Sequence, residues 1–267
     1  MLFQTLDDKQ ECVGVYANGN LYFDKIPPDL SKTWKYTGSI ESDEVEYAWI
    51  YCHGKSISEA CPERLQGTWE RVFKKLTAYK KAFTIAKLDL REHCFFDLVP
   101  DDALVEFCEV KNQITEHIFE NYEKPENYDY LNDAAKLLYK IKHRDLLLER
   151  KDWRHHFRSH SLLAAANKIV NGNHHIDYNL FGTVTGRLST HPGSLPILTM
   201  KRELRRVIKP RNDWFLSLDY NGAEARTVLA LSEQTQPPID IHEWNMRHVF
   251  EESTLVREEA KTLFFAW

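Results

Sequence analysis

The chain has 267 residues, of which 43% are hydrophobic and 28% are charged. This composition is typical of a folded globular protein and excludes a largely disordered one. No apolar run approaches the roughly 20 residues that cross a bilayer, so we expect no association with a membrane. The first residues carry neither a basic start nor a long apolar stretch and do not predict a signal peptide.

The cysteines point to an intracellular protein. The five cysteines are odd in number and scattered, and none has CxxC spacing. Such a set favours reduced thiols over a disulfide framework or a zinc site. We therefore expect a cytoplasmic location.

The two halves of the chain differ in charge. Residues 1–135 carry 15 Lys and Arg against 25 Asp and Glu, whereas residues 136–267 carry 20 against 15. The net charge of −5 hides this difference. A polyanionic partner should therefore meet the second half.

Residues 1–95 predict a small α/β domain. Residues 11–23 alternate around Asn18-Gly19 like a hairpin, residues 46–52 predict a strand, and residues 66–83 have helical spacing. A remnant of a proofreading exonuclease is one interpretation of this domain. It would be inactive, because we find no Asp-x-Glu on a strand to hold metal ions.

Residues 96–172 predict a helical region. Long helices are expected from residue 101 to before Pro125 and over residues 129–148, and we expect the two to be antiparallel neighbours. A short helix is expected over residues 161–171. The second long helix ends in a basic run that continues to Arg158. Two interpretations stay open: a solvated helix face, or a surface that follows phosphates.

Residues 173–236 contain the first chemical motifs. Residues 174–180 alternate like a strand and predict one. Thr185-Gly186-Arg187-Leu188-Ser189 and a basic cluster at 201–211 follow. Residues 214–218 predict a strand that ends at Asp219, and a helical pattern opens at Glu224. A carboxylate at the end of a strand is well placed to hold a divalent cation.

Residues 237–267 add two further motifs. Asp240-Ile241-His242 predicts the start of a helix. Arg257, Lys261 and Phe265 recur every four residues, which places two cations and a ring on one helix face. Two cations can hold a triphosphate, and a ring can stack on a base.

Together these motifs resemble the family A DNA polymerases, the bacterial DNA polymerase I type. Four stand in the family's order: Thr-Gly-Arg-Leu-Ser, Asp-Tyr-x-x-x-Glu-x-Arg, Asp-Ile-His and Arg-x-x-x-Lys-x-x-x-Phe. The residues at 195–200 and 264–267 are most similar to bacteriophage members, which would place the protein in the host cytoplasm. The resemblance covers residues 180–267 and, more loosely, the helices at 101–148.

The resemblance implies an α+β right-hand fragment in which residues 96–172 form the thumb, 173–236 part of the palm and 237–267 the start of the fingers. Asp219 and the carbonyl of Tyr220 would hold Mg²⁺ for DNA synthesis from dNTPs on primer–template DNA. Glu224 would exclude a 2′-hydroxyl, and Arg226 would be a structural salt-bridge partner. The triphosphate and base contacts would come from His242, Arg257, Lys261 and Phe265, and the duplex contacts from Thr185, Arg187, Lys201, Arg202, Arg205 and Arg206.

The motifs also depart from the family's pattern. Small filler residues stand between Tyr220 and Glu224, and Leu198 stands where an arginine is expected. The sequence given stops at Trp267, before the motif that carries the second metal-binding aspartate. We therefore expect a split or truncated enzyme that is inactive until a second polypeptide supplies the remaining fingers and palm.

Two other functions stay open. The chain could be a non-catalytic nucleic-acid-binding protein derived from a polymerase, although the retained Asp219 and Glu224 favour the enzyme. It could also be an interaction scaffold of another class, in which case the four ordered motifs would be coincidental.

Overall fold

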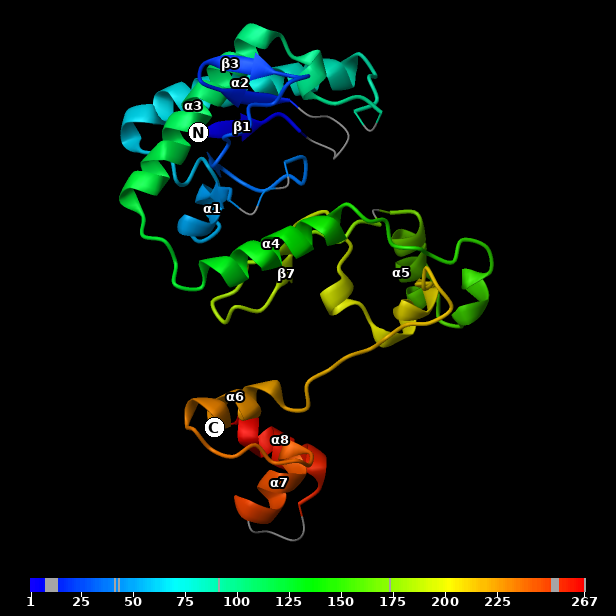
Figure 1. Cartoon of the computed structure of the whole chain (residues 1–267). Helices are drawn as coiled ribbons and strands as arrows, with labels where there is room; N and C mark the ends of the chain where they lie inside the picture. The colour runs from blue at the N-terminus through cyan, green and yellow to red at the C-terminus, as the bar shows by residue number, and fades with distance from the viewer. Residues whose placement is uncertain are drawn as a thin grey trace. The chain divides into compact units, whose positions relative to one another are not determined.

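The structure, a computed structural model, describes residues 1–7, 14–40, 42, 44–90, 92–172, 174–250 and 255–266, with only the backbone of Phe265. It divides into two compact units, Met1–Lys209 and Pro210–Trp267. The predicted boundaries at residues 95, 172 and 236 do not coincide with this division. Helices and small sheets occur together, which confirms the α+β class (Figure 1).

The first unit contains all the strands of the described residues and five α-helices. The strands are β1 (Phe3–Thr5), β2 (Val15–Ala17), β3 (Asn20–Tyr22), β4 (Lys32–Thr33), β5 (Glu46–Tyr47), β6 (Tyr178–Asn179) and β7 (Ser189–Thr190). The α-helices are α1 (Ala48–Tyr51), α2 (Glu63–Ile85), α3 (Asp101–Asn121), α4 (Tyr128–Lys142) and α5 (His160–Val170). Short 3-10 helices are η1 (Phe96–Leu98), η2 (Trp153–His156), η3 (Ile197–Thr199) and η4 (Arg202–Val207).

The strands form three small sheets. β1, β2 and β3 form an antiparallel sheet in that order, β4 pairs with β5 in parallel, and β6 pairs with β7 antiparallel. The predicted hairpin is confirmed in its described part, since Asn18 and Gly19 join β2 to β3 with φ of 47° and 80°. Positive φ at both turn residues matches the twist of the flanking strands.

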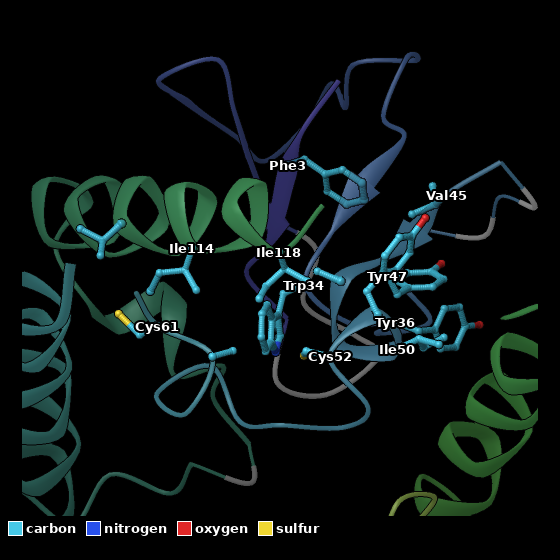
Figure 2. Close-up of a cluster of buried hydrophobic side chains, with 14 of the residues drawn as sticks. Phe3, Trp34, Tyr36, Val45, Tyr47, Ile50, Cys52, Cys61, Ile114 and Ile118 are labelled. Atoms are coloured by element: carbon cyan, nitrogen blue, oxygen red, sulfur yellow. The ribbon is translucent and has the colours of Figure 1, made fainter. Parts of the chain in front are cut away.

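The main core lies between this sheet region and α3. Ile114 and Ile118, one helical turn apart, are fully buried against a cluster that includes Phe3 and Trp34 (Figure 2). The buried Gln4 adds a polar link from β1, because its amide donates to Asn112 Oδ1 at 2.9 Å and to Thr115 Oγ1 at 3.0 Å on α3. The apolar spacing predicted for this helix therefore faces the core.

Shortening Ile114 should destabilise the first unit. We expect Ile114→Ala to lower the free energy of unfolding by about 2–5 kcal/mol, because a buried side chain is lost and a cavity remains. Ile85→Ala is the matched control, since Ile85 is 72% exposed at the end of α2. Urea unfolding followed by far-UV circular dichroism measures both; equal losses would contradict the position of Ile114 in the core.

Four sequence predictions for the first unit need correction. The strand predicted at 46–52 is a strand only over Glu46–Tyr47, because Ala48, Ile50 and Tyr51 bury their side chains from a helical turn that packs on α3 and α4. The helix predicted over 129–148 ends at Lys142, because the later backbone pairs with other segments: Leu146 N–H with the His174 carbonyl, and Leu148 with Ile208.

The strand predicted over 174–180 is confined to Tyr178–Asn179. The carbonyls of His174 and His175 accept from Leu146 and Leu195 instead of from a neighbouring strand. The two long helices predicted as antiparallel neighbours have other main partners: α3 packs on α2, and α4 packs on α1. Among the described residues, no helix combines the length and apolar character that a bilayer crossing requires.

A second core of the first unit surrounds α5. Trp153, Ala166, Ile169, Leu204 and Val207 are buried there together. Trp153 and Val207 come from η2 and η4, and η4 packs against both α5 and η2. The basic residues of η2 and η4 are exposed around it.

Candidate functional site

The second unit contains three helices that carry three of the four motifs. They are α6 (Ala223–Leu231), α7 (Ile241–His248) and α8 (Arg257–Phe265), and α7 packs against α8. All three were predicted from the sequence. Residues 220–226 precede and open α6, Asp240 precedes α7, and Arg257 opens α8.

Asp240 connects these motifs through its carboxylate. It caps α7 by accepting from the N–H groups of His242 at 2.9 Å and Glu243 at 3.2 Å. Its second oxygen accepts from the Asn221 amide and from Arg257, whose Nη2 lies 2.8 Å away. These donors, Arg257 foremost, hold the pKa of Asp240 well below its usual range, so the carboxylate is ionised at neutral pH.

Asn221 fastens the turn before α6 to the start of α7. Its amide nitrogen donates to Asp240, and its Oδ1 accepts from the backbone N–H of Ile241 at 2.9 Å. The predicted metal-binding motif is thus bonded to the Asp-Ile-His motif about twenty residues later. Sequence reasoning missed this role, because Asn221 stands where the family's pattern has only filler.

Gly222 allows this close approach. Its φ is +61°, and a Cβ at this position would collide with the side chain of Ile241. Glycine is therefore required here both for the left-handed backbone and for space.

We expect Gly222→Ala to loosen the contact between α6 and α7. Left-handed backbone costs an alanine about 1–2 kcal/mol, and overpacking adds typically 1–3 kcal/mol. Gly19→Ala is the matched control, since Gly19 has φ +80° and open space where a Cβ would lie. Hydrogen exchange of peptides over residues 221–248 measures the effect; protection unchanged from the native chain would contradict it.

Arg226 holds the loop between α6 and α7. Its guanidinium donates to the carbonyls of Asn221, Pro237 and Ile239 at 2.8, 2.9 and 2.8 Å. The predicted role was structural through a salt bridge. Among the described residues its partners are carbonyl and amide oxygens, so the residue is structural but the predicted kind of partner is wrong.

The side chain of His242 is buried and does not lie at the protein surface. It is 3% exposed, and its ring lies edge-on to Phe264 with centroids 6.3 Å apart. Burial lowers its pKa, and Arg257 and Lys261 lower it further against the opposing effect of Asp240. The lowered pKa favours the neutral imidazole at pH 7.

Arg257 and Lys261 share one face of α8, as predicted. Arg257 is bound to Asp240, whereas Lys261 is exposed. Phe265 belongs to the same helix, but its side chain lies outside the described part of the structure, as does Trp267. The two cations are thus close to each other, and one of them already has a carboxylate partner.

Asp219 and Tyr220 lie on an exposed segment outside any helix or strand. The strand predicted over 214–218 is wrong for this chain: Trp214, Leu216 and Leu218 are each more than 80% exposed. A strand needs a hydrogen-bonded neighbour, and the described residues provide none here. Glu224 is exposed in the first turn of α6, where its charge suits the helix dipole.

The residues that could hold a metal ion are few. The described residues contain no cluster of three or more His, Cys, Asp or Glu suited to a metal. As metal ligands, Asp219 could provide one carboxylate and Tyr220 one backbone carbonyl. Mg²⁺ often uses only one or two protein carboxylates and completes its shell with phosphates and water, so these residues fit a partial Mg²⁺ site.

The predicted DNA contacts all belong to the first unit. Thr185 and Arg187 are exposed in the turn between β6 and β7, which Thr183 stabilises by donating to the Arg187 carbonyl at 2.7 Å. The remaining cations lie on or beside η4, where Leu204 and Val207 are buried and the basic side chains face solvent: Lys201, Arg202, Arg205 and Arg206. Both segments present charge that a phosphate backbone could meet.

No family model, no curated protein and no solved structure matches this chain. The polymerase resemblance therefore rests on the four short sequence motifs alone.

Proposed function

We propose that the chain is part of a family A DNA polymerase that carries out template-directed DNA synthesis together with a second polypeptide. The observation that supports this most is the carboxylate of Asp240, which binds Asn221 and Arg257. It joins three motifs that are separate in sequence and that a polymerase needs around one nucleotide. A bacteriophage replication enzyme in the cytoplasm of its host is the setting that the motifs favour.

In this proposal, Asp219 and the Tyr220 carbonyl would hold Mg²⁺, which neutralises triphosphate charge and makes the primer hydroxyl a better nucleophile. Lys261 would bind the triphosphate through the compact charge of its ammonium group. Arg257 would bind it through the paired N–H donors of its guanidinium group. Glu224 would occupy the space of a 2′-hydroxyl. Phe265 would lie near the new base pair, and His242 would support α8 through Phe264.

The right-hand arrangement belongs to the same proposal. Residues 96–172 would act as the thumb, residues 173–236 as part of the palm and residues 237–267 as the start of the fingers. Thr185, Arg187 and the cations of residues 201–206 would contact the duplex backbone.

A second polypeptide is supported by the exposed segment at 214–218. Soluble proteins rarely leave several large apolar side chains in water side by side. The same residues have the composition of a buried strand. Covering them with the rest of a palm would give Trp214 and its neighbours a partner and bring further carboxylates to Asp219.

Primer extension tests the proposal. The chain would be purified alone and after co-expression with the product of the neighbouring open reading frame, and each sample given primer–template DNA, dNTPs and Mg²⁺. We expect extension only by the co-purified complex. Extension by the chain alone would refute the need for a partner, and a stable complex that cannot extend would refute the polymerase function.

A non-catalytic nucleic-acid-binding protein is the second candidate. The ion pair between Arg257 and Asp240 favours this candidate, because Arg257, which was expected to bind the triphosphate, already has a structural partner. A complex that binds primer–template DNA but shows no dNTP-dependent change in affinity would support this alternative.

A further inference from the structure

A cavity of about 580 Å³ lies in the first unit between residues 150–154 and the end of α5. Arg150, Lys151 and Arg154 line it from one side, and Asn167, Asn171 and His174 from the other. None of these residues belongs to the duplex contacts that the resemblance implies, although Arg150, Lys151 and Arg154 lie in the basic run for which the sequence left a phosphate-following surface open. The cavity is thus a separate concave site on the second core.

Buried side chains hold the basic wall in place. Trp153 is 5% exposed and packs in the second core beside Val170, which also lines the cavity. The guanidinium carbon of Arg154 lies 5.5 Å from the centroid of the Trp153 ring, so the cation rests on an aromatic face. An anchored wall loses less side-chain freedom on binding than mobile surface lysines do.

The charge of the cavity has one sign. No Asp or Glu lines it, and within the described residues Arg150, Lys151 and Arg154 form no ion pair. Of the two neighbouring carboxylates, Glu149 is paired with Lys209, and Asp152 is exposed outside the lining of the hollow. Three cations that line one hollow attract an anion, because concave walls concentrate the field.

Polar donors complete the match to a phosphate. Asn171 Nδ2 donates to Asn167 Oδ1 at 2.9 Å, which fixes the orientation of both amides. The Asn167 amide nitrogen then has no acceptor among the described residues. Guanidinium, ammonium and amide N–H groups around one hollow are the donors that a tetrahedral phosphate accepts from.

We propose that this cavity binds phosphate groups of a nucleic-acid backbone, as a contact separate from the motif residues. Exposed cations continue along the chain on both sides of it, at Lys140, Arg144 and Arg158. A single phosphate ion needs only the hollow, whereas a polymer also meets this flanking charge. The choice of nucleic acid rests on the proposed function; the affinity for phosphate does not.

The test is binding of fluorescently labelled single-stranded and duplex DNA by the full chain, followed by anisotropy at several salt concentrations. We expect Arg150→Gln, Lys151→Gln and Arg154→Gln together to weaken binding at low salt at least about tenfold. The salt slope should fall by about one for each lost phosphate contact. The matched control removes three exposed lysines of α2: Lys74→Gln, Lys80→Gln and Lys81→Gln.

Four results would overturn the proposal. One is equal weakening by the control triple, which would show general charge attraction. The second concerns the variant with all three cavity substitutions, called the cavity triple. If it binds DNA as the native chain does, but no longer binds pyrophosphate, the site would be assigned to free phosphates. Native DNA binding by the cavity triple, with no pyrophosphate binding by the native chain, would exclude a phosphate site altogether. Weakened binding with altered tryptophan fluorescence, not restored by Arg150→Lys together with Arg154→Lys, would show damage to the core.

The same assay separates this proposal from the polymerase function. The anisotropy titration uses the chain without dNTPs, so its result does not depend on primer extension. A complex that fails to extend primers, but loses DNA affinity with the cavity triple alone, would refute the polymerase function and support the phosphate site.

Discussion

Replacing Asp219 by asparagine should lower kcat/KM for primer extension by the complemented complex about 10³-fold or more. Loss of groups that merely support a metal ligand costs about 10–100-fold, and loss of the ligand itself should cost more. An amide keeps the size of the carboxylate but removes the charge that attracts Mg²⁺. Steady-state extension with a labelled primer measures the change.

Asp213→Asn is the control for this experiment. Asp213 is exposed six residues earlier on the same segment and should be replaceable without effect. Binding of primer–template DNA should be unchanged in both variants, because neither residue belongs to the basic segments. Native extension by the Asp219 variant would remove this residue from the chemistry and favour the non-catalytic alternative.

Replacing Asp240 should disrupt the second unit more than any other single change there. Asp240→Ala removes the cap of α7, worth about 0.5–2 kcal/mol, and also the carboxylate that holds Arg257 and Asn221. Asp240→Asn keeps a good cap residue but removes the charge. We therefore expect hydrogen-exchange protection of α7 and α8 to fall in the order native, asparagine, alanine, with Asp213→Ala unchanged.

The pH dependence gives an independent measurement of the same pair. The pKa of Asp240 is lower in the folded chain than the unfolded value of about 3.9. Its contribution to stability is therefore present above about pH 4 and is lost as the pH falls towards the folded pKa. The hydrogen-exchange protection of α8 should decline as the pH falls in the native chain and stay constant in Asp240→Asn. If protection declines equally with pH in both proteins, the ion pair would be contradicted.

The helices of the second unit could be predicted from local signals. Asp240 stands directly before an apolar helical pattern, and an aspartate there accepts from the first free N–H groups. The period of four at Arg257, Lys261 and Phe265 predicted α8 in the same way. Such signals depend only on residues that are neighbours in the sequence, so these helices can be predicted without knowledge of the tertiary fold.

The predictions that failed depend on distant partners. Residues 214–218 have the composition of a strand. Composition shows only that a segment is suited to a sheet, and a neighbouring strand must be present for the sheet to form. Asn221 had no visible role because its two bonds reach Asp240 and Ile241 far along the chain. The basic cavity likewise joins residues 150–154 to the end of α5, which no spacing rule connects.

The exposed run from Trp214 to Leu218 has a consequence for handling the protein. Several β-prone apolar side chains in water form a template to which an identical chain can add edge to edge. Solubility, rather than the free energy of folding, should then limit the yield of the chain made alone. Light scattering should rise steeply with concentration in the native chain and much less in a Leu216→Lys variant, although both fold.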